Sequence, residues 1–332
     1  MTWRQIMFAT ASPGLIEPST LSKVARLASA FDADVEMFHC VYDSGIARPG
    51  HFGSRGVAQD IREIVEQSHR RLDVAAQRLR AGGVRVRTTV RWDYPPHEGI
   101  VRQVLRHKPN LLIAQSTRRG RVARLMLTQT DYRLIETCPC PLLLIKTSRP
   151  YTEGCVVAAV DPAHAHDKPA ALDDAILDVA GTVSQGLGAA LHTYHACAPW
   201  ADVMRDSPEL RQLPKALQAD AQAGYQKRSE DAVFALARRQ KVRKEHVHVE
   251  EGDASESLPR FASSVSADIV VMGAVSRSLL KRAFIGHTAE QLLDALDCDV
   301  LIAKPPDFRS PVVRQSVHRL PKSTAAGARY IW

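Results

Sequence analysis

PNLLIA at residues 109–114 and ADIVVM at residues 267–272 each open a block of the same layout. The first block closes with CPLLLIK at residues 140–146 and the second with CDVLIAK at residues 298–304. Three matching pairs share one separation of 158 positions: Asn110 with Asp268, Thr130 with Thr288, and Lys146 with Lys304. This period is too long for a solenoid repeat and has the size of a complete domain. The sequence therefore predicts two tandem copies of one domain.

Each copy alternates short apolar segments with helix-like segments. The run Leu111–Gln115 is apolar throughout, whereas Asp60–Ala81 has its apolar residues at helical spacing and ends at Gly82-Gly83. Strands separated by helices of this length favour a parallel sheet that is buried on both faces. We therefore expect an α/β protein in which each copy has a five-stranded parallel sheet with helices on both faces.

The predicted boundaries place the first domain at residues 1–148 and the second at residues 153–306. Pro305-Pro306 stops the second copy, and residues 307–332 have little hydrophobic periodicity, so we expect a basic, flexible tail. The copies differ most at Tyr42–Gln59 and Cys197–Lys215, which follow the second strand of each copy. We expect both segments to be loops at the binding rim, where loops often determine ligand choice.

Composition limits the class of protein. Hydrophobic residues make up 45% and charged residues 24% of the 332 positions, which is ordinary for a globular protein. No apolar run approaches the roughly 18 residues that a membrane span needs, and the first residues lack a signal-peptide layout. We expect a cytoplasmic protein with no membrane partner. The net charge of +8 comes with no recognition motif, so nucleic acid is not an expected partner.

A glycine pattern in the second copy points to a ligand site. Gly273 directly follows an apolar strand, Ser276 stands three positions later, and Gly286 follows after nine further residues. Glycine allows a sharp turn that presents backbone N–H groups, and Gly286 precedes a predicted helix whose first turn would favour an anion. Asp161 ends the first strand of this copy, where a carboxylate can accept hydrogen bonds from a ribose or a base edge. A plain structural turn remains the alternative interpretation.

With these residues the chain resembles the universal stress protein family, in its tandem-domain branch. The ATP-binding members of that family have a glycine, two residues, a glycine, nine residues, and a glycine followed by serine or threonine. The resemblance covers residues 3–148 and 153–305, and Val249-Glu250-Glu251-Gly252 also matches it. It implies flavodoxin-like domains arranged as an internal pseudo-dimer, with further dimerisation left open, and a role in survival of stress that includes DNA damage.

This chain departs from the ATP-binding pattern. Ser276 replaces the second glycine, and His287 replaces the hydroxyl residue after the third, with Thr288 one position later. The residues implied for a nucleotide-like or other acidic ligand are Asp161, Gly273, Ser276, Arg277, Gly286, His287 and Thr288. The ligand is unknown, and ATP is one candidate. In the first copy the glycines are missing, because Gln115, Arg118 and Thr128 occupy their places.

Arginines crowd the degenerate loop of the first copy. Arg118, Arg119 and Arg121 could hold an acidic group in place of the lost backbone cradle, although a solvated charged loop has the same composition. Cys138 and Cys140 lack the C-x-x-C spacing and a second pair, and we assign no metal site. We assign no catalytic residue either. The expectation is a non-enzymatic stress protein; the alternatives are an ATP-binding protein with weak ATPase activity and a regulatory adaptor.

Overall fold

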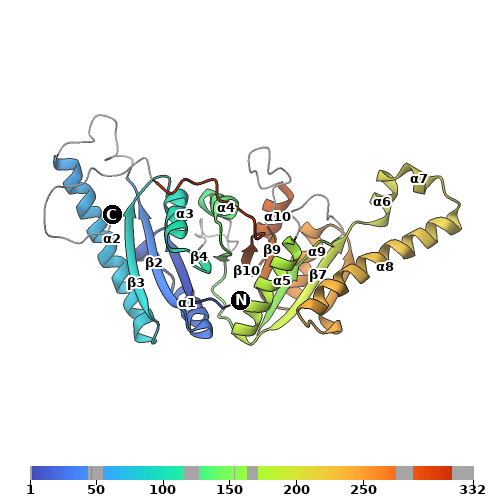
Figure 1. Cartoon of the computed structure of the whole chain (residues 1–332), viewed down its shortest axis with the longest axis horizontal. Helices are drawn as coiled ribbons and strands as arrows, with labels where there is room; N and C mark the ends of the chain where they lie inside the picture. Colours follow the sequence, from blue (N-terminus) through green and yellow to red (C-terminus); the bar gives the residue numbers. More distant parts are fainter. Residues whose placement is uncertain are drawn as a thin grey trace. The chain divides into compact units, whose positions relative to one another are not determined.

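The computed structural model describes residues 2–43, 46, 55–115, 127–152, 154–162, 171–273 and 287–315, and these divide into two compact units (Figure 1). The amino-terminal unit comprises Trp3–Gln115, Thr128–Leu142 and the segment from Arg309. The carboxy-terminal unit comprises Leu143–Phe308 together with Leu127. Among the described residues, no helix combines the length and the apolar character needed to cross a membrane.

The amino-terminal unit has a parallel sheet with strand order β3-β2-β1-β4. The strands are β1 (Gln5–Thr10), β2 (Asp34–Val41), β3 (Val86–Trp92) and β4 (Leu111–Gln115). The helical segments are η1 (Pro13–Leu15), α1 (Pro18–Phe31), α2 (Arg55–Ala81), α3 (Pro96–His107) and α4 (Gln129–Thr137). The sequence of the first copy continues into a fifth strand, β5 (Leu142–Ile145).

The carboxy-terminal unit has the strand order β5-β10-β9-β6-β7-β8. Its own strands are β6 (Cys155–Ala159), β7 (Ala190–Cys197), β8 (Val247–Glu251), β9 (Ala267–Gly273) and β10 (Asp299–Ala303). Its helices are α5 (Leu172–Leu187), α6 (Trp200–Asp206), α7 (Pro208–Arg211), α8 (Lys215–Arg239), η3 (Lys244–His246), α9 (Ala254–Ser264) and α10 (His287–Ala295). The β6–β7, β6–β9, β7–β8 and β9–β10 pairs are all parallel.

The central strands are buried over most of their length, as expected of a parallel sheet with helices on both faces. Every residue of β10 is buried, and so are the first four residues of β4 and of β6. A glycine follows the last turn of α2 and of α5 and lets the chain change direction there. Gly83 after α2 and Gly188 after α5 have positive φ angles of 82° and 69°, which glycine adopts without a steric penalty.

The expected fold is confirmed: two tandem α/β copies, each contributing five strands in the order of the repeat. The expectation that Cys197–Lys215 is a loop is wrong, because it contains α6 and α7, which Figure 1 places beside the outer part of α8. The segment Tyr42–Gln59 is likewise not a loop to its end, since α2 already begins at Arg55. Short helices that pack on a neighbour leave little periodicity in the sequence.

The strand order fixes where a ligand can bind. From β6 the chain moves outward to β7 and β8 and then crosses back to β9 on the other side of β6. The crevice between the carboxyl ends of β6 and β9 is therefore the switch point, where ligands bind in open α/β sheets. The same argument places the switch point of the amino-terminal unit between β1 and β4.

Candidate functional site

Asp161 lies at the switch point of the carboxy-terminal unit. It lies two residues after β6, and its backbone N–H donates to Asp173 Oδ1 of α5 at 3.1 Å. The Asp161 side chain is 46% exposed and can reach a ligand above the strand ends. His195 on β7 is buried beside it, with Nδ1 donating to Val160 O at 3.1 Å and lying 3.8 Å from Asp161 Oδ1.

Gly273 ends β9 on the other side of the switch point. β9 pairs with β6, so Gly273 and Asp161 lie at the adjacent carboxyl ends of these two strands. A Cβ atom at position 273 would lie 2.7 Å from Leu172 Cδ2 and 3.0 Å from Leu172 Cγ. Leu172 opens α5 and is buried, so it has little room to move. Glycine is thus required here by the close packing of α5, whatever the loop after it binds.

We predict that Gly273→Ala destabilises the carboxy-terminal unit by about 1–3 kcal/mol, because the added methyl group overpacks a filled position. Calorimetric unfolding of the full chain measures the change. Leu172→Ala should create space for the methyl group, so the double variant should lose less stability than the sum of the two single variants. Strict additivity would show that Leu172 is not the residue that excludes the side chain.

The first copy lacks this pair of groups. His39 Nδ1 donates to Thr10 O at 2.9 Å, as His195 does to Val160 O, which places Ala11 at the position of Asp161. The strand register places Gln115 at the position of Gly273. His39 and His195 are both buried and hold neighbouring strand ends together. The switch point of the amino-terminal unit therefore offers neither the carboxylate nor the glycine turn.

The remaining predicted site residues are less fully placed. His287 and Thr288 are the first two residues of α10, which confirms a helix start at this point. Ser276, Arg277 and Gly286 lie outside the described residues, as do Arg118, Arg119 and Arg121 of the first copy. Among the residues that the structure describes, no group of three or more His, Cys, Asp or Glu side chains is placed to hold a metal ion.

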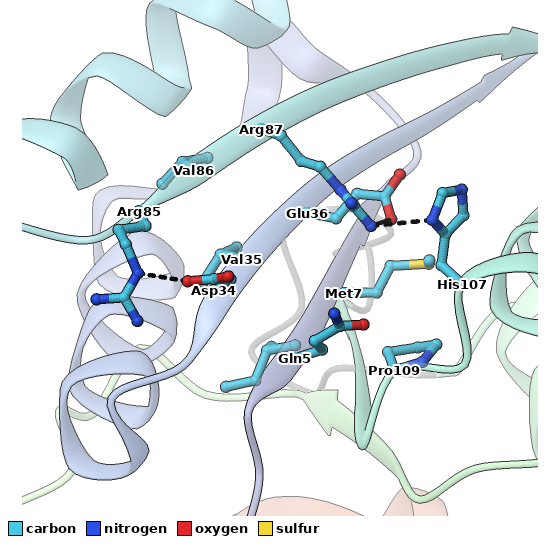
Figure 2. A pocket seen from close by; sticks show the side chains of 11 residues that line it. Gln5, Met7, Asp34, Val35, Glu36, Arg85, Val86, Arg87, His107 and Pro109 are labelled. Carbon is cyan, nitrogen blue, oxygen red and sulfur yellow. Dashed lines mark hydrogen bonds and ion pairs between the residues drawn. The ribbon is translucent and has the colours of Figure 1, made fainter. Parts of the chain in front are cut away.

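A cavity of about 220 Å³ lies at the amino ends of β1, β2 and β3, at the other end of these strands from the switch point (Figure 2). Two cross-strand ion pairs line it: Arg85 Nε donates to Asp34 Oδ1 at 2.5 Å, and Arg87 Nη2 to Glu36 Oε2 at 2.8 Å. Sequence reasoning missed this cavity. The sequence does contain a signal: Asp34 and Glu36 are two positions apart in one segment, and Arg85 and Arg87 are two positions apart in another. This spacing places each pair of like charges on one face of its strand.

The chain matches the model of the universal stress protein family twice, at residues 2–146 and 156–304. It is 26% identical over 318 residues to Universal stress protein E of Salmonella typhi, covering 94% of this chain and 98% of the relative. Universal stress protein E of Escherichia coli K12 is 25% identical over 315 residues, with the same coverages. A crystal structure of a functionally unknown protein from Pseudomonas aeruginosa PAO1 matches with a TM-score of 0.69 and 26% identity, covering 92% of this chain and 94% of that one.

Proposed function

The chain belongs to the universal stress protein family and to its stress-response proteins, and we propose that it acts as a non-catalytic binder of a small nucleotide-like or acidic ligand in its second copy. The ligand occupies the crevice between the carboxyl ends of β6 and β9. The observation that carries the proposal is the asymmetry of the two switch points: Asp161 and Gly273 flank one, whereas Ala11 and Gln115 flank the other.

The chemistry of the crevice supports a ligand with hydrogen-bond donors near Asp161. The backbone of Asp161 is fixed, because its N–H donates to Asp173 Oδ1 at 3.1 Å. An exposed carboxylate beside a strand end can accept two donors from one molecule, as a ribose diol or a base edge would supply. The start of α10 at His287 adds backbone N–H groups that favour an acidic group on the same ligand.

The first experiment is isothermal calorimetry of the full chain with ATP and ADP in the presence of Mg²⁺. We expect one site per chain. Asp161→Ala should weaken it about tenfold or more, since a hydrogen bond to a charged group contributes about 1.5–3 kcal/mol. The matched control is Asp174→Ala, which removes an equal charge from α5, where Asp174 forms an exposed pair with Arg239 of α8. An affinity that Asp161→Ala leaves unchanged would contradict the proposal, and so would a stoichiometry of two equal sites per chain.

The same samples test the absence of catalysis. We expect no release of phosphate from ATP above the rate without protein, because the proposal includes no general base and no metal ligand beside the phosphates. Steady phosphate release that Asp161→Ala abolishes would favour the ATPase alternative. The proposed role in DNA-damaging stress is tested by the survival of a deletion strain after ultraviolet irradiation. The strain is compared with and without a plasmid that carries the Asp161→Ala gene.

A further inference from the structure

Three histidine rings form a stack in the carboxy-terminal unit: His192 on β7, His246 on η3 and His248 on β8. We call these three side chains the imidazole stack. The His192 ring centroid lies 4.1 Å from that of His246 and 5.2 Å from that of His248, with interplanar angles of 13° and 10°. Phe261 of α9 packs on the stack, with its ring centroid 4.6 Å from that of His248.

The amino-terminal unit has a fixed ion pair at the same place in the fold. Because His39 and His195 are equivalent, Glu36 corresponds to His192. The strand register then matches Arg87 with His246 and Thr89 with His248. Glu36 is buried and accepts hydrogen bonds from Arg87, Thr89 and Gln103 at 2.8, 2.9 and 2.6 Å.

Figure 2 shows the ends of Arg87, Glu36 and His107 close together, and Arg87 Nη2 lies 3.1 Å from His107 Nδ1. The groups that replace the imidazole stack here are a carboxylate, a guanidinium and a hydroxyl, and His107 borders them from α3. Imidazole is the side chain that changes its charge between about pH 5 and 8. The second copy has thus replaced a permanent ion pair with groups that titrate.

The hydrogen bonds of the stack limit the number of protons that the three rings can carry. His192 Nδ1 and His248 Nε2 face each other at 3.0 Å, so only one of these two nitrogens can carry a proton. Arg243 Nη2 donates to His246 Nε2 at 3.2 Å, which requires that nitrogen to be an acceptor. If each ring carried a second N–H, the His192–His248 and Arg243–His246 contacts would each bring two donors together. The rings would then be parallel cations about 4–5 Å apart, and they would repel each other.

The surrounding charges compensate only partly for such protonation. The charged groups on η3, β8 and α9 are Lys244, Glu245, Glu250, Glu251, Glu256 and Arg260, and Arg243 precedes η3. Glu250 lies on β8 and is shared, because it accepts from Tyr194 OH at 3.1 Å and lies 3.8 Å from Arg260. Glu245 pairs with Arg243 at 3.4 Å. Within the described part of the chain, Glu245 and Glu250 make their contacts to Arg243, Tyr194 and Arg260.

The strand that the stack holds is the last in its sheet. β8 ends the strand order and pairs with β7, and the stack joins β8 and η3 to β7 through side chains. We propose that the imidazole stack is a proton-sensitive latch, which holds β8 and η3 on β7 at neutral pH and releases them when the medium becomes acidic. This inference does not depend on the proposed ligand site, which lies at the switch point.

The electrostatics agree with this geometry. Burial, followed by the neighbouring His246 and His248 and by Arg243, lowers the pKa of His192 to about 4. Burial and His246 lower the pKa of His248, against an opposing effect of Glu250. A histidine with a lowered pKa in the folded state binds protons better when unfolded. The stability it contributes is therefore complete above about pH 6.5 and is lost as the pH falls toward about 4.

The experiment is NMR of the full chain between pH 7.5 and 4.5, which follows the histidine ring signals and the amide exchange of residues 247–251. We expect the opening of β8, corrected for the intrinsic pH dependence of exchange, to rise on the order of tenfold, allowing for solvent screening of partly exposed rings. His192→Phe keeps a ring in the stack without a titrating group, so it should remove most of this rise.

His69→Phe is the matched control, because His69 lies on α2 and pairs with Asp73 at an exposed site. It should leave the response of β8 unchanged. Equal opening of β8 at pH 7.5 and 4.5 in the unmodified chain would overturn the proposal. A normal His192 titration near pH 6.5 would also overturn it, and this measurement needs no variant. An acid response that survives in His192→Phe would show that other groups release the strand.

Discussion

Replacing Asp299 with alanine is expected to destabilise the carboxy-terminal unit by about 3–5 kcal/mol, because it removes one member of a buried charged network. Asp299 is fully buried at the start of β10. Its Oδ1 accepts from Lys146 N at 2.8 Å and Thr147 N at 2.9 Å, and its Oδ2 accepts from Tyr151 OH at 2.6 Å. Alanine would leave these donors without their acceptor in the interior.

Lys146 makes the loss larger. Its buried Nζ donates to Leu293 O and Leu296 O at the end of α10, and burial lowers its pKa, whereas nearby acidic groups including Asp299 raise it. The variant therefore removes a negative charge from beside a buried ammonium group. Calorimetric unfolding of the full chain measures the effect. Asp299→Asn, which keeps one acceptor oxygen, should lose less stability than the alanine variant.

Asp297→Ala is the surface control for this experiment, because Asp297 is exposed two residues away and its side chain can be removed for about 0.5 kcal/mol or less. Equal small losses for positions 297 and 299 would show that the network contributes little. The segment after β5 would then be held by strand pairing alone.

Arg102→Met should destabilise the amino-terminal unit by about 3–5 kcal/mol, since it leaves a carboxylate buried without its cation. Arg102 lies on α3 and is only 2% exposed, and its Nη1 donates to Asp93 Oδ1 at 2.7 Å. The guanidinium also bonds Glu98 and, through Nε, donates to Val313 O at 3.3 Å. The variant should therefore also release the segment Pro311–Val313, which can be followed by limited proteolysis.

A second substitution separates charge burial from simple loss of packing. Adding Asp93→Asn to Arg102→Met removes the buried charge, so the double variant should recover part of the lost stability. Arg106→Met, on the same helix, should have a small effect because Arg106 is only half-buried and bonds Gln103 at 3.4 Å. No recovery in the double variant would mean that the aliphatic part of Arg102, rather than its charge, supports the unit.

The repeat explains why so much of the fold could be predicted. Strands such as Leu111–Gln115 have the predicted bounds, because a fully buried parallel strand requires a continuous apolar run that is visible in the sequence. The predicted helix Asp60–Ala81 is α2, which ends at Ala81 as predicted and begins five residues earlier, at Arg55. Asp161 lies two residues after β6 and Gly273 is the last residue of β9, so both lie at the ends of strands that the apolar runs predict; their role in binding stays a prediction.

The sequence by itself determined the doubling of the domain, its α/β class and the loss of the glycine pattern in the first copy, because these depend on local order along the chain. The tertiary structure decided which distant side chains meet. Glu36 with Arg87, and His192 with His246 and His248, are brought together only by strand register. Arg102 and Val313 are more than 200 positions apart in the sequence. Such contacts depend on how the folded elements pack, and a local sequence pattern holds no information about partners so far apart in the chain.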